Sequence, residues 1–382
     1  MEEGKLTEAR AAIAEADREM ARFFVRRMEA VRDIAAYKRE RGLPILDAAQ
    51  EERVIRRNLE YIESEELRDL YVRFLRDTMR ISRDYQRRLT EGCRVAYSGV
   101  EGAFAHIAVR RIFPDAVPVS CMDFQSAYES VERGECDFCV LPVENSYAGE
   151  VGQVTDLMFT GSLHVTGMYS LPVEHCLLGL PDSDPEKIRR AVSHPQALSQ
   201  CAEYLRRRGL ETEQASNTAR AAQTILQRGD PATAAIASRE TAGLYGLKIL
   251  AERINESDLN ATRFAVFSRA ENREIPARAA GFLLLFTVNH MAGALAGAVR
   301  VIGQHGFNMR VLRSRPMKNL PWQYYFYAEI EGDDRSGEGR QMLRELEQHC
   351  NILKTAGRFG PEIDLKDESN LKDGTHQTIQ TK

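Results

Sequence analysis

The stretch Asn260-Ala261-Thr262-Arg263-Phe264 organises the sequence around it. It leads into an apolar run that ends at Phe267, which predicts a strand with polar groups at its start. An amide, a hydroxyl and a guanidinium all bind small anions, so we expect these three side chains to face one ligand. A turn that gives a strand a polar start is the simpler interpretation of the five residues taken alone.

Two more polar motifs lie upstream, each directly after a short apolar run: Val143-Glu144-Asn145-Ser146 and Ser193-His194-Pro195-Gln196. The second motif predicts a capping box, in which the Ser193 hydroxyl accepts a hydrogen bond from the Gln196 amide. Capping alone accounts for that motif, and Asn145 is equally suited to a left-handed turn. The occurrence of all three motifs in one α/β region favours a binding site.

The region that contains these motifs, about 92–272, alternates predicted strands, glycine-containing turns and helices. Strands are expected at 93–97, 138–143, 191–192, 234–237 and 264–267. This order predicts two α/β lobes with a cleft between them, the second lobe lying at about 168–254. The glycines do not follow GxGxxG spacing, which argues against a dinucleotide ligand.

Residues 1–91 predict an all-α domain of three helices. Apolar residues recur at helical spacing, and neither proline nor glycine occurs between Gly4 and Gly42, so a long first helix is expected there. Asp47 is placed to open a second helix that ends near Ser64, and a third helix is expected at 65–90.

Polar side chains fall on the apolar stripes of these helices. Arg27 and Lys38 lie on the stripe of the first helix, and Ser82 and Gln86 lie on that of the third. Burial of a lone cation is costly, so inward-facing cations and amides suit a small dianion bound in the bundle core. The alternative is a helical dimerisation arm whose arginines form a solvated face.

Residues 278–362 predict a small α+β module. The expected order is strand 282–286, helix 293–304, strands 307–312 and 324–330, helix 339–350 and strand 352–355. This βαββαβ order is ferredoxin-like. Residues 363–382 are polar and are expected to form a disordered tail.

Length and composition exclude several classes of protein. A chain of 382 residues is expected to be multidomain, and its net charge of −4 gives no basic field for nucleic acid. No window approaches the length of an apolar membrane span, and the N-terminal residues lack the core of a signal peptide. We therefore expect a cytoplasmic protein without a membrane or nucleic-acid partner.

The seven cysteines are expected to be free thiols in a reducing compartment. Cys136 and Cys139 have the CxxC form, but they lie in a predicted strand, where positions three apart point to opposite faces. Without a second pair to complete a zinc site, both are interpreted as core residues. Neither a metal nor another cofactor is expected.

Together, these patterns resemble the bifunctional chorismate mutase-prephenate dehydratase family over nearly the whole chain. The helical segment resembles the three-helix chorismate mutase, which forms an interlocked dimer. The central region resembles the two-lobed prephenate dehydratase, and the C-terminal module resembles an amino-acid-binding ACT domain. The resemblance implies chorismate and prephenate as substrates, phenylalanine as effector, and a homodimer or higher homo-oligomer.

The resemblance also implies roles for particular residues. In the mutase, Lys38 and Gln86 would donate to the ether oxygen of chorismate, and the substrate would be bound by Arg10, Arg27, Asp47, Glu51 and Ser82. In the dehydratase, Thr262 would assist loss of the ring hydroxyl, and the substrate would be bound by Asn145, Ser193, Gln200 and Arg263. Phenylalanine would be bound by Gly293, Ala294, Leu295, Ser314, Arg315 and Pro316.

One residue departs from the family pattern in the regulatory module. Arg313 stands where glutamate is usual, so binding of phenylalanine is expected to be weaker or the preferred effector different. Two other classes fit parts of the chain, a solute-binding α/β module and a non-catalytic amino-acid sensor, and either could be fused to a mutase. The mutase residues on the buried stripe of the first helix speak against both as the role of the whole chain.

Overall fold

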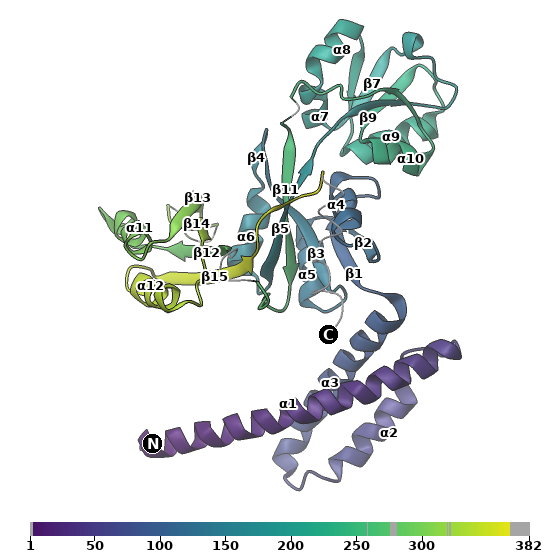
Figure 1. The fold of residues 1–382 in the computed structure, drawn as a ribbon. Helices are drawn as coiled ribbons and strands as arrows, with labels where there is room; N and C mark the ends of the chain where they lie inside the picture. Colours follow the sequence, from purple (N-terminus) through teal and green to yellow (C-terminus); the bar gives the residue numbers. More distant parts are fainter. Residues whose placement is uncertain (1–2, 258, 276–280, 319, 321, 367–382) are drawn as a thin grey trace. The chain divides into compact units, whose positions relative to one another are not determined.

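The computed structural model describes residues 3–257, 259–275, 281–318, 320 and 322–366 (Figure 1). The chain divides into two compact units, Met1–Cys93 and Arg94–Lys382.

The first unit is helical, as its periodicity predicts. Its described residues form α1 (Glu3–Glu40), α2 (Ala48–Leu59) and α3 (Glu65–Glu91). Asp47 caps α2 by accepting a hydrogen bond from the Gln50 amide at 2.9 Å. The helix ends at Leu59, before the expected Ser64, because the residues between them form a turn and an extended segment.

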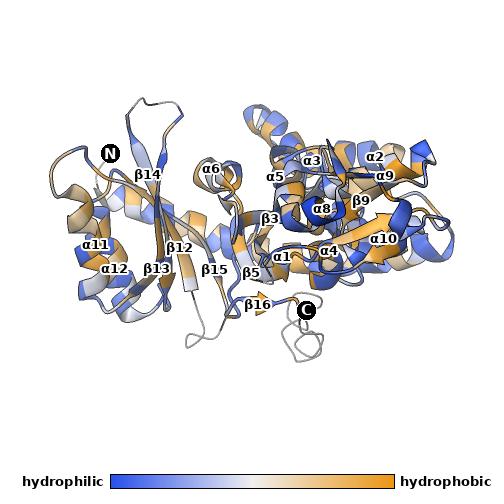
Figure 2. Ribbon diagram, turned by 90° about the horizontal axis from the view of Figure 1, so that it is seen from above, coloured by the Kyte–Doolittle hydropathy of each residue, from blue (hydrophilic) through white to orange (hydrophobic). Residues whose placement is uncertain are grey.

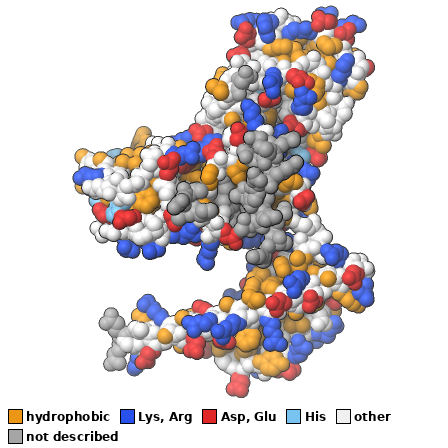
Figure 3. Space-filling model, viewed as in Figure 1, with side chains coloured by type: hydrophobic (Ala, Val, Ile, Leu, Met, Phe, Trp, Pro, Cys, Tyr) orange, Lys and Arg blue, Asp and Glu red, His pale blue; other side chains and the backbone are white. Residues whose placement is uncertain are grey.

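Much of the apolar stripe of α1 is exposed in this single chain. Val31 and Ala35 are buried where α1 packs on α3, at 6% and 2% exposure. The N-terminal part of the helix instead exposes Leu6, Ile13, Met20, Phe23 and Phe24. Hydrophobic side chains lie exposed among basic and acidic ones on the visible face of this unit in Figure 3. An exposed apolar patch of this kind marks an interaction surface.

The first lobe of the second unit is a mixed sheet flanked by helices. Its strands are β1 (Arg94–Ser98), β2 (Val117–Cys121), β3 (Phe138–Asn145), β5 (His164–Pro172) and β11 (Ala261–Ser268), and its helices are α4 (Phe104–Ile112), α5 (Phe124–Glu132) and α6 (Gly152–Thr160). Strand β1 is parallel to β2 and β3, whereas β11 lies antiparallel between β3 and β5. The short strand β4 (Gly149–Glu150) extends the edge beside β3.

The second lobe has its own sheet, in the order β10-β6-β9-β7-β8 among the described residues. Its strands are β6 (Cys176–Gly179), β7 (Arg190–Ser193), β8 (Glu211–Gln214), β9 (Thr233–Ala237) and β10 (Lys248–Ala251), and its helices are α7 (Pro195–Gln200), α8 (Ala202–Arg208), α9 (Thr218–Arg228) and α10 (Arg239–Tyr245), with a 3-10 turn at Pro185–Lys187. The lobe begins later than the expected position near 168, because Met168 pairs with Ala265 inside the first sheet.

The C-terminal module has the predicted βαββαβ order. Its elements are β12 (Gly281–Thr287), α11 (Ala294–Gln304), β13 (Asn308–Pro316), β14 (Tyr324–Glu331), α12 (Gly337–Glu347) and β15 (Ile352–Phe359). The strands lie in the order β13-β14-β12-β15, and β15 continues onto β5 of the first lobe. The described strands of the module and of the first lobe therefore form one sheet.

The module and the first lobe also share a hydrophobic core. Leu283, Tyr325 and Tyr327 of the module belong to the same buried cluster as Met158 and Phe267 of the lobe. The other face of the module, towards α11 and α12, has a separate core. Figure 2 shows β12 as predominantly hydrophobic, while the two helices carry both colours, as expected of elements with one buried face.

Part of the predicted disordered tail is ordered, so that prediction is wrong for residues 363–366. Ile363 and Asp364 form β16, which pairs with Tyr169 and Ser170 of β5, and Leu365 is 2% exposed. The segment orders because β5 offers an unpaired edge beyond β15 and Leu365 finds an apolar site. Residues 367–382 of the predicted tail lie outside the described part of the chain.

Cys136 and Cys139 are buried in the first-lobe core, as predicted. Within the described ranges, no cluster of His, Cys, Asp and Glu is arranged to hold a metal ion. No helix among the same residues is long and apolar enough to cross a membrane.

Candidate active sites

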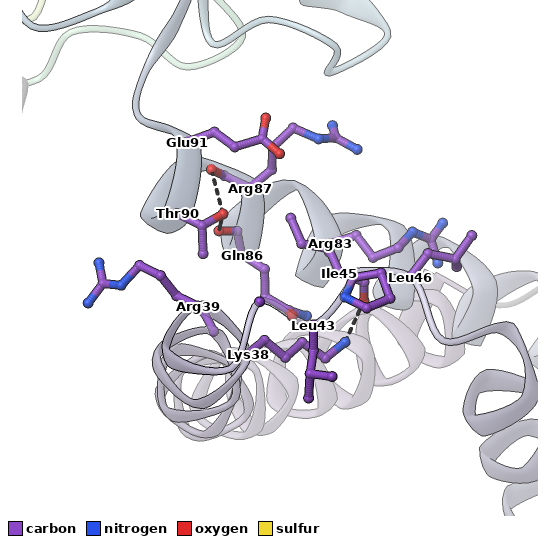
Figure 4. A pocket seen from close by; sticks show the side chains of 13 residues that line it. Lys38, Arg39, Leu43, Ile45, Leu46, Arg83, Gln86, Arg87, Thr90 and Glu91 are labelled. Carbon is purple, nitrogen blue, oxygen red and sulfur yellow. Dashed lines mark hydrogen bonds between the residues drawn. The ribbon is translucent and has the colours of Figure 1, made fainter.

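A pocket of about 440 Å³ lies inside the helical unit (Figure 4). It is lined by the end of α1, the loop that follows and the C-terminal half of α3: Ala35, Lys38, Arg39, Gly42, Leu43, Pro44, Ile45, Leu46, Arg83, Gln86, Arg87, Thr90 and Glu91. Basic side chains predominate over the acidic Glu91 in this lining, so the pocket favours an anionic ligand.

The two predicted mutase donors meet in this pocket. The Lys38 ammonium donates to the Ile45 carbonyl at 2.5 Å, which directs the side chain across the pocket. Gln86 is 7% exposed, and its Oε1 atom has no hydrogen-bond partner among the described residues. A buried amide with an unpaired atom is costly, so the pocket is suited to a polar ligand.

Ser82 lies one helical turn before Gln86 on α3, and Arg27 of α1 contacts it. The Arg27 guanidinium donates to the Ser82 hydroxyl and to the Thr78 carbonyl, the latter at 3.4 Å. Burial lowers the pKa of Arg27 from its ordinary value. The structure thus brings a half-buried cation to the same face of the bundle as Lys38.

The remaining predicted mutase residues are placed less uniformly. Glu51 accepts a hydrogen bond from Arg83 of α3. Arg83 lines the pocket and was not among the predicted site residues. The signal for it was its place on α3, which was expected to line a site. The Asp47 carboxylate is engaged as the α2 cap. Arg10 is exposed on the N-terminal part of α1 and does not join the group.

The stretch around Thr262 does not face one ligand, so that prediction is wrong for Arg263. Strand β11 pairs Thr262 with Asn145 and Arg263 with Glu144 on β3. Successive side chains of a strand point to opposite faces, so Thr262 faces the cleft side with Asn145. The Arg263 guanidinium lies on the other face, 3.0 Å from Glu144, 2.9 Å from Glu329 and 2.9 Å from Glu362.

Asn145 makes several hydrogen bonds on the side of the first lobe that meets the second lobe. Its Oδ1 accepts from the amides of Tyr147 and Ala148 at 3.0 and 2.9 Å and from Gln196 Nε2 at 3.1 Å. Its Nδ2 lies 3.2 Å from Asn260 Oδ1 and 3.0 Å from Thr262 Oγ1. Because Gln196 comes from the second lobe, Asn145 joins the two lobes.

Thr262 is left with a hydroxyl proton to donate. Its Oγ1 accepts from Asn145 at 3.0 Å, and no described residue accepts a hydrogen bond from it. A hydroxyl that accepts one hydrogen bond is polarised by it and donates a stronger hydrogen bond to a second partner.

Ser193 does not cap α7, so the capping prediction is wrong. The cap is His194, whose Nδ1 accepts from the Gln196 amide at 3.2 Å. The Ser193 hydroxyl, fully buried at the end of β7, donates to the Ile236 carbonyl at 2.7 Å. Proline at the first helical position moves the helix start one residue later than the capping-box pattern assumes.

Two residues where the lobes meet keep side-chain nitrogens without partners among the described residues. Gln200 and Asn260 are each 6% exposed, and Gln200 Nε2 and Asn260 Nδ2 have no partner among the described residues. Gln200 Oε1 lies 2.8 Å from Nε2 of His175. Asn260 opens the polar stretch in the sequence, whereas His175 is a single histidine before an apolar strand, and nothing in the sequence marks it.

The predicted effector residues are divided between two places in the module. Gly293 caps α11 with φ of +81°, a conformation that favours glycine, and Ala294 and Leu295 follow in the first turn. Ser314, Arg315 and Pro316 lie within β13 rather than after it, because the strand continues to Pro316.

Alternate residues of β13 differ in their surroundings. Ser314 is exposed, while Arg315 donates to Asp156 and lies beside Tyr325, both at 3.0 Å. Arg313, the residue that departs from the family pattern, donates to Glu144 of the first lobe. Both arginines therefore join the module to the lobe.

A helical unit with a largely basic pocket, followed by a two-lobed α/β unit, is the architecture of an enzyme with two catalytic domains, and each part matches a family of enzymes. Residues 9–87 match the family model of chorismate mutase type II, and residues 95–272 match that of prephenate dehydratase. A bifunctional chorismate mutase/prephenate dehydratase of Enterobacter agglomerans is 32% identical over 70% of this chain and 71% of its own. An arogenate dehydratase/prephenate dehydratase of Arabidopsis thaliana is 34% identical over 70% and 72%.

Solved structures agree with this fold. A prephenate dehydratase from Arthrobacter aurescens in complex with L-Phe is 25% identical, with a TM-score of 0.66 over 70% of this chain and 90% of that one. A protein described as a novel type of quorum quenching acylase has the same TM-score of 0.66, at 30% identity over 70% and 98%.

The chain belongs to the family of bifunctional chorismate mutase/prephenate dehydratases. It is an enzyme of phenylalanine biosynthesis that rearranges chorismate to prephenate and converts prephenate to phenylpyruvate.

Proposed function

We propose that the rearrangement of chorismate takes place in the helical pocket, with Lys38 and Gln86 as donors to the ether oxygen. The reaction is pericyclic and needs a site that holds the folded substrate and stabilises the charge that grows on that oxygen. The Lys38 ammonium and the amide nitrogen of Gln86, two residues of the pocket lining, supply such donors. The Arg27 guanidinium binds one carboxylate, and Glu51, Ser82 and Asp47 maintain the pocket around it.

The mutase site is completed by a second copy of the chain. Arg10 and Arg27 are seventeen residues apart on α1, or roughly 25 Å along the axis, which exceeds the length of chorismate. One helix therefore cannot supply both arginines to one substrate. The exposed apolar side chains around Arg10 carry this proposal, because a partner helix would cover them.

Subunit exchange tests the shared site. Chains with Arg10→Ala and Arg27→Ala, each inactive alone, should recover part of the mutase activity when they are mixed and allowed to exchange. Mixing two preparations of the same variant is the control and should recover nothing. If heterodimers are shown to form but mutase activity does not recover, the proposal of a site shared between two chains is contradicted.

In the second unit, prephenate binds at the side-chain nitrogens that lack protein partners. Gln200 Nε2 and Asn260 Nδ2 bind substrate carboxylate, and the Thr262 hydroxyl donates to the ring hydroxyl as it leaves. The single observation that carries this proposal is the pair of buried unpartnered nitrogens, because such donors are costly unless a ligand engages them. Asn145, Ser193 and Arg263 shape the cleft through their protein contacts.

Steady-state kinetics test this assignment. Gln200→Leu and Asn260→Leu should each raise KM for prephenate about tenfold, while mutase activity is unchanged. Asn272→Leu, in the same unit but bonded to the Thr166 carbonyl, is the control and should leave KM unaltered. An unchanged KM in both cleft variants would contradict the assignment.

The C-terminal module, residues 278–362, acts as an ACT domain that binds phenylalanine and lowers dehydratase activity. Its strand order and the L-Phe complex of the Arthrobacter aurescens relative support this role. The open backbone at Gly293 and the exposed Ser314 provide a place for the ligand between two copies of the module. Arg313 forms an ion pair with Glu144. This ion pair compensates the charge of Arg313, so its repulsion of the ligand's ammonium is reduced.

Calorimetry with phenylalanine, tyrosine and tryptophan, beside initial rates on prephenate, tests the regulatory role. Phenylalanine should bind and lower the rate. Binding without a change in rate would remove the regulatory claim, and no binding by any of the three would leave the module with a structural role.

A further inference from the structure

His175 lies where the chain crosses from the first lobe to the second. It stands between the end of β5 and the start of β6, and it is 2% exposed. Its backbone amide donates to Asn255 Oδ1 at 3.0 Å, and its carbonyl accepts from Ile254 at 2.9 Å, both on the returning crossing. The ring meets Phe104 of α4 edge-on, at 5.8 Å between centroids. The imidazole is therefore held from several sides.

The contact of this ring with Gln200 fixes where its proton lies. Burial lowers the pKa of His175, although the hydrogen bond to Gln200 opposes the shift, so the ring is neutral near pH 7. Gln200 Oε1 is 2.8 Å from Nε2. A hydrogen on Nε2 therefore has an acceptor, whereas a hydrogen on Nδ1 would be a buried donor without a partner, so Nε2 carries the hydrogen. Nδ1 is then a bare acceptor, and it has no partner among the described residues.

We propose that His175 is a positioning residue that holds the Gln200 amide with its nitrogen, rather than its oxygen, towards the substrate. A glutamine amide can rotate by half a turn, which exchanges a donor for an acceptor at nearly the same place. With the oxygen towards prephenate, the site would repel a carboxylate. The Nε2 hydrogen of His175 favours the productive orientation because only the oxygen of Gln200 can accept it.

The helix that carries Gln200 makes this orientation relevant to the cleft. Gln196 and Gln200 are four residues apart on α7 and lie on one face. Gln196 reaches Asn145 across the cleft at 3.1 Å, so Gln200 lies one turn from a group that touches the first lobe. This inference rests on the proposed role of Gln200 in binding prephenate.

A double-mutant cycle in the full chain tests the coupling. His175→Phe and Gln200→Leu should each raise KM for prephenate about tenfold, with kcat changed less than about threefold. The double variant should have the KM of the worse single variant within about twofold, because both changes remove one interaction. Independent effects, which multiply to about a hundredfold, would overturn the proposal.

Two further variants separate positioning from packing. His175→Gln, whose amide nitrogen reaches about as far as Nε2, should restore KM to within about threefold of the parent. His164→Phe makes the same change at the far end of β5, roughly 25 Å along the strand from Pro172, and should leave KM unchanged. If His175→Phe does not fold, as judged by circular dichroism and thermal unfolding, His175→Ala replaces it in the cycle.

The outcomes distinguish this inference from the proposed site. If Gln200→Leu leaves KM unchanged, Gln200 does not bind prephenate, and both proposals fail. If Gln200→Leu raises KM while the His175 variants do not, the site stands and the positioning role is overturned.

Discussion

In the proposed dehydratase site, the Thr262 hydroxyl assists departure of the ring hydroxyl. It accepts from Asn145 and keeps its proton for the substrate. Thr262→Val removes the donor at nearly constant volume, so kcat for prephenate should fall about a hundredfold or more. Thr262→Ser keeps the donor and should retain much of the rate. A small loss in Thr262→Val, measured by formation of phenylpyruvate, would assign the role to another group.

Lys38 gives the reciprocal prediction in the first unit. Lys38→Ala removes the ammonium that crosses the pocket, so mutase kcat should fall by about a hundredfold or more. Dehydration of supplied prephenate should stay near that of the parent, because the two reactions use separate units. Loss of both activities in a folded Lys38→Ala chain would show that the sites are misassigned.

At the residue level, helix periodicity indicated that Lys38 and Gln86 face inward, and both residues line one pocket. The predictions for Arg263 and Ser193, at strand ends, were wrong about their contacts. The direction of Arg263 depends on the register of β11 against β3, which a single strand does not reveal. Ser193 and His194 compete for one cap, and the bond from Ser193 to Ile236 involves a strand distant in sequence.

Between elements, an ion-pair network joins β11 of the first lobe to β14 of the module. Arg263 and Glu329 are 16% and 2% exposed, so their pair is shielded from water. Tyr327 donates to the same Glu329 carboxylate at 2.7 Å. The network supports the strand that carries Thr262 from the face opposite the cleft.

Removal of the Glu329 charge should destabilise the second unit. Glu329→Gln leaves the buried Arg263 with less compensation, so the free energy of unfolding should fall by about 3 kcal/mol. Glu331→Gln, on the exposed end of the same strand, is the control and should change it by less than about 0.5 kcal/mol. Equal effects in the two variants, measured by urea unfolding, would contradict a special role for the network.

The same pair gives the unit an acid-sensitive contribution to stability. Burial of Glu329 opposes ionisation, but the Arg263 guanidinium overrides it and lowers the pKa of the carboxyl below its ordinary value. A carboxyl with a lowered folded-state pKa stabilises fully above its unfolded value, about 4.3, and this stability is lost as pH falls through the lower folded value. The acid dependence of unfolding should therefore be weaker in Glu329→Gln than in the parent.

For the whole molecule, the order of the secondary-structure elements was easier to predict from the sequence than the contacts that join the module to the first lobe. Alternation of apolar residues was sufficient for the βαββαβ order, because each element carries its own periodicity. The contact of Gly357 with Val165, which joins β15 to β5, depends on two segments nearly two hundred residues apart in the chain. The ordering of Leu365 likewise requires a strand edge that only the folded lobe presents.

The two units should respond differently to separation. A chain of residues 1–93 should fold and keep mutase activity as a dimer, because its pocket is lined entirely from within that unit. A chain ending at residue 275 exposes the lobe surface that packs on Leu283, Tyr325 and Tyr327. Loss of several large buried contacts, at about 1.5–3 kcal/mol each, approaches the whole stability of a domain, so this chain should be insoluble or unfolded. A soluble, active truncated dehydratase would contradict this expectation.

The core shared by the module and the lobe couples the packing of the two parts. Tyr325 stacks on Phe159 of the lobe, with 4.3 Å between ring centroids, and donates to Asp156, so a substitution at Tyr325 disturbs both parts at once. Ser314, exposed on the same module, is not part of that shared core. A substitution at Ser314 should therefore change the surface of the module while the dehydratase lobe keeps its packing.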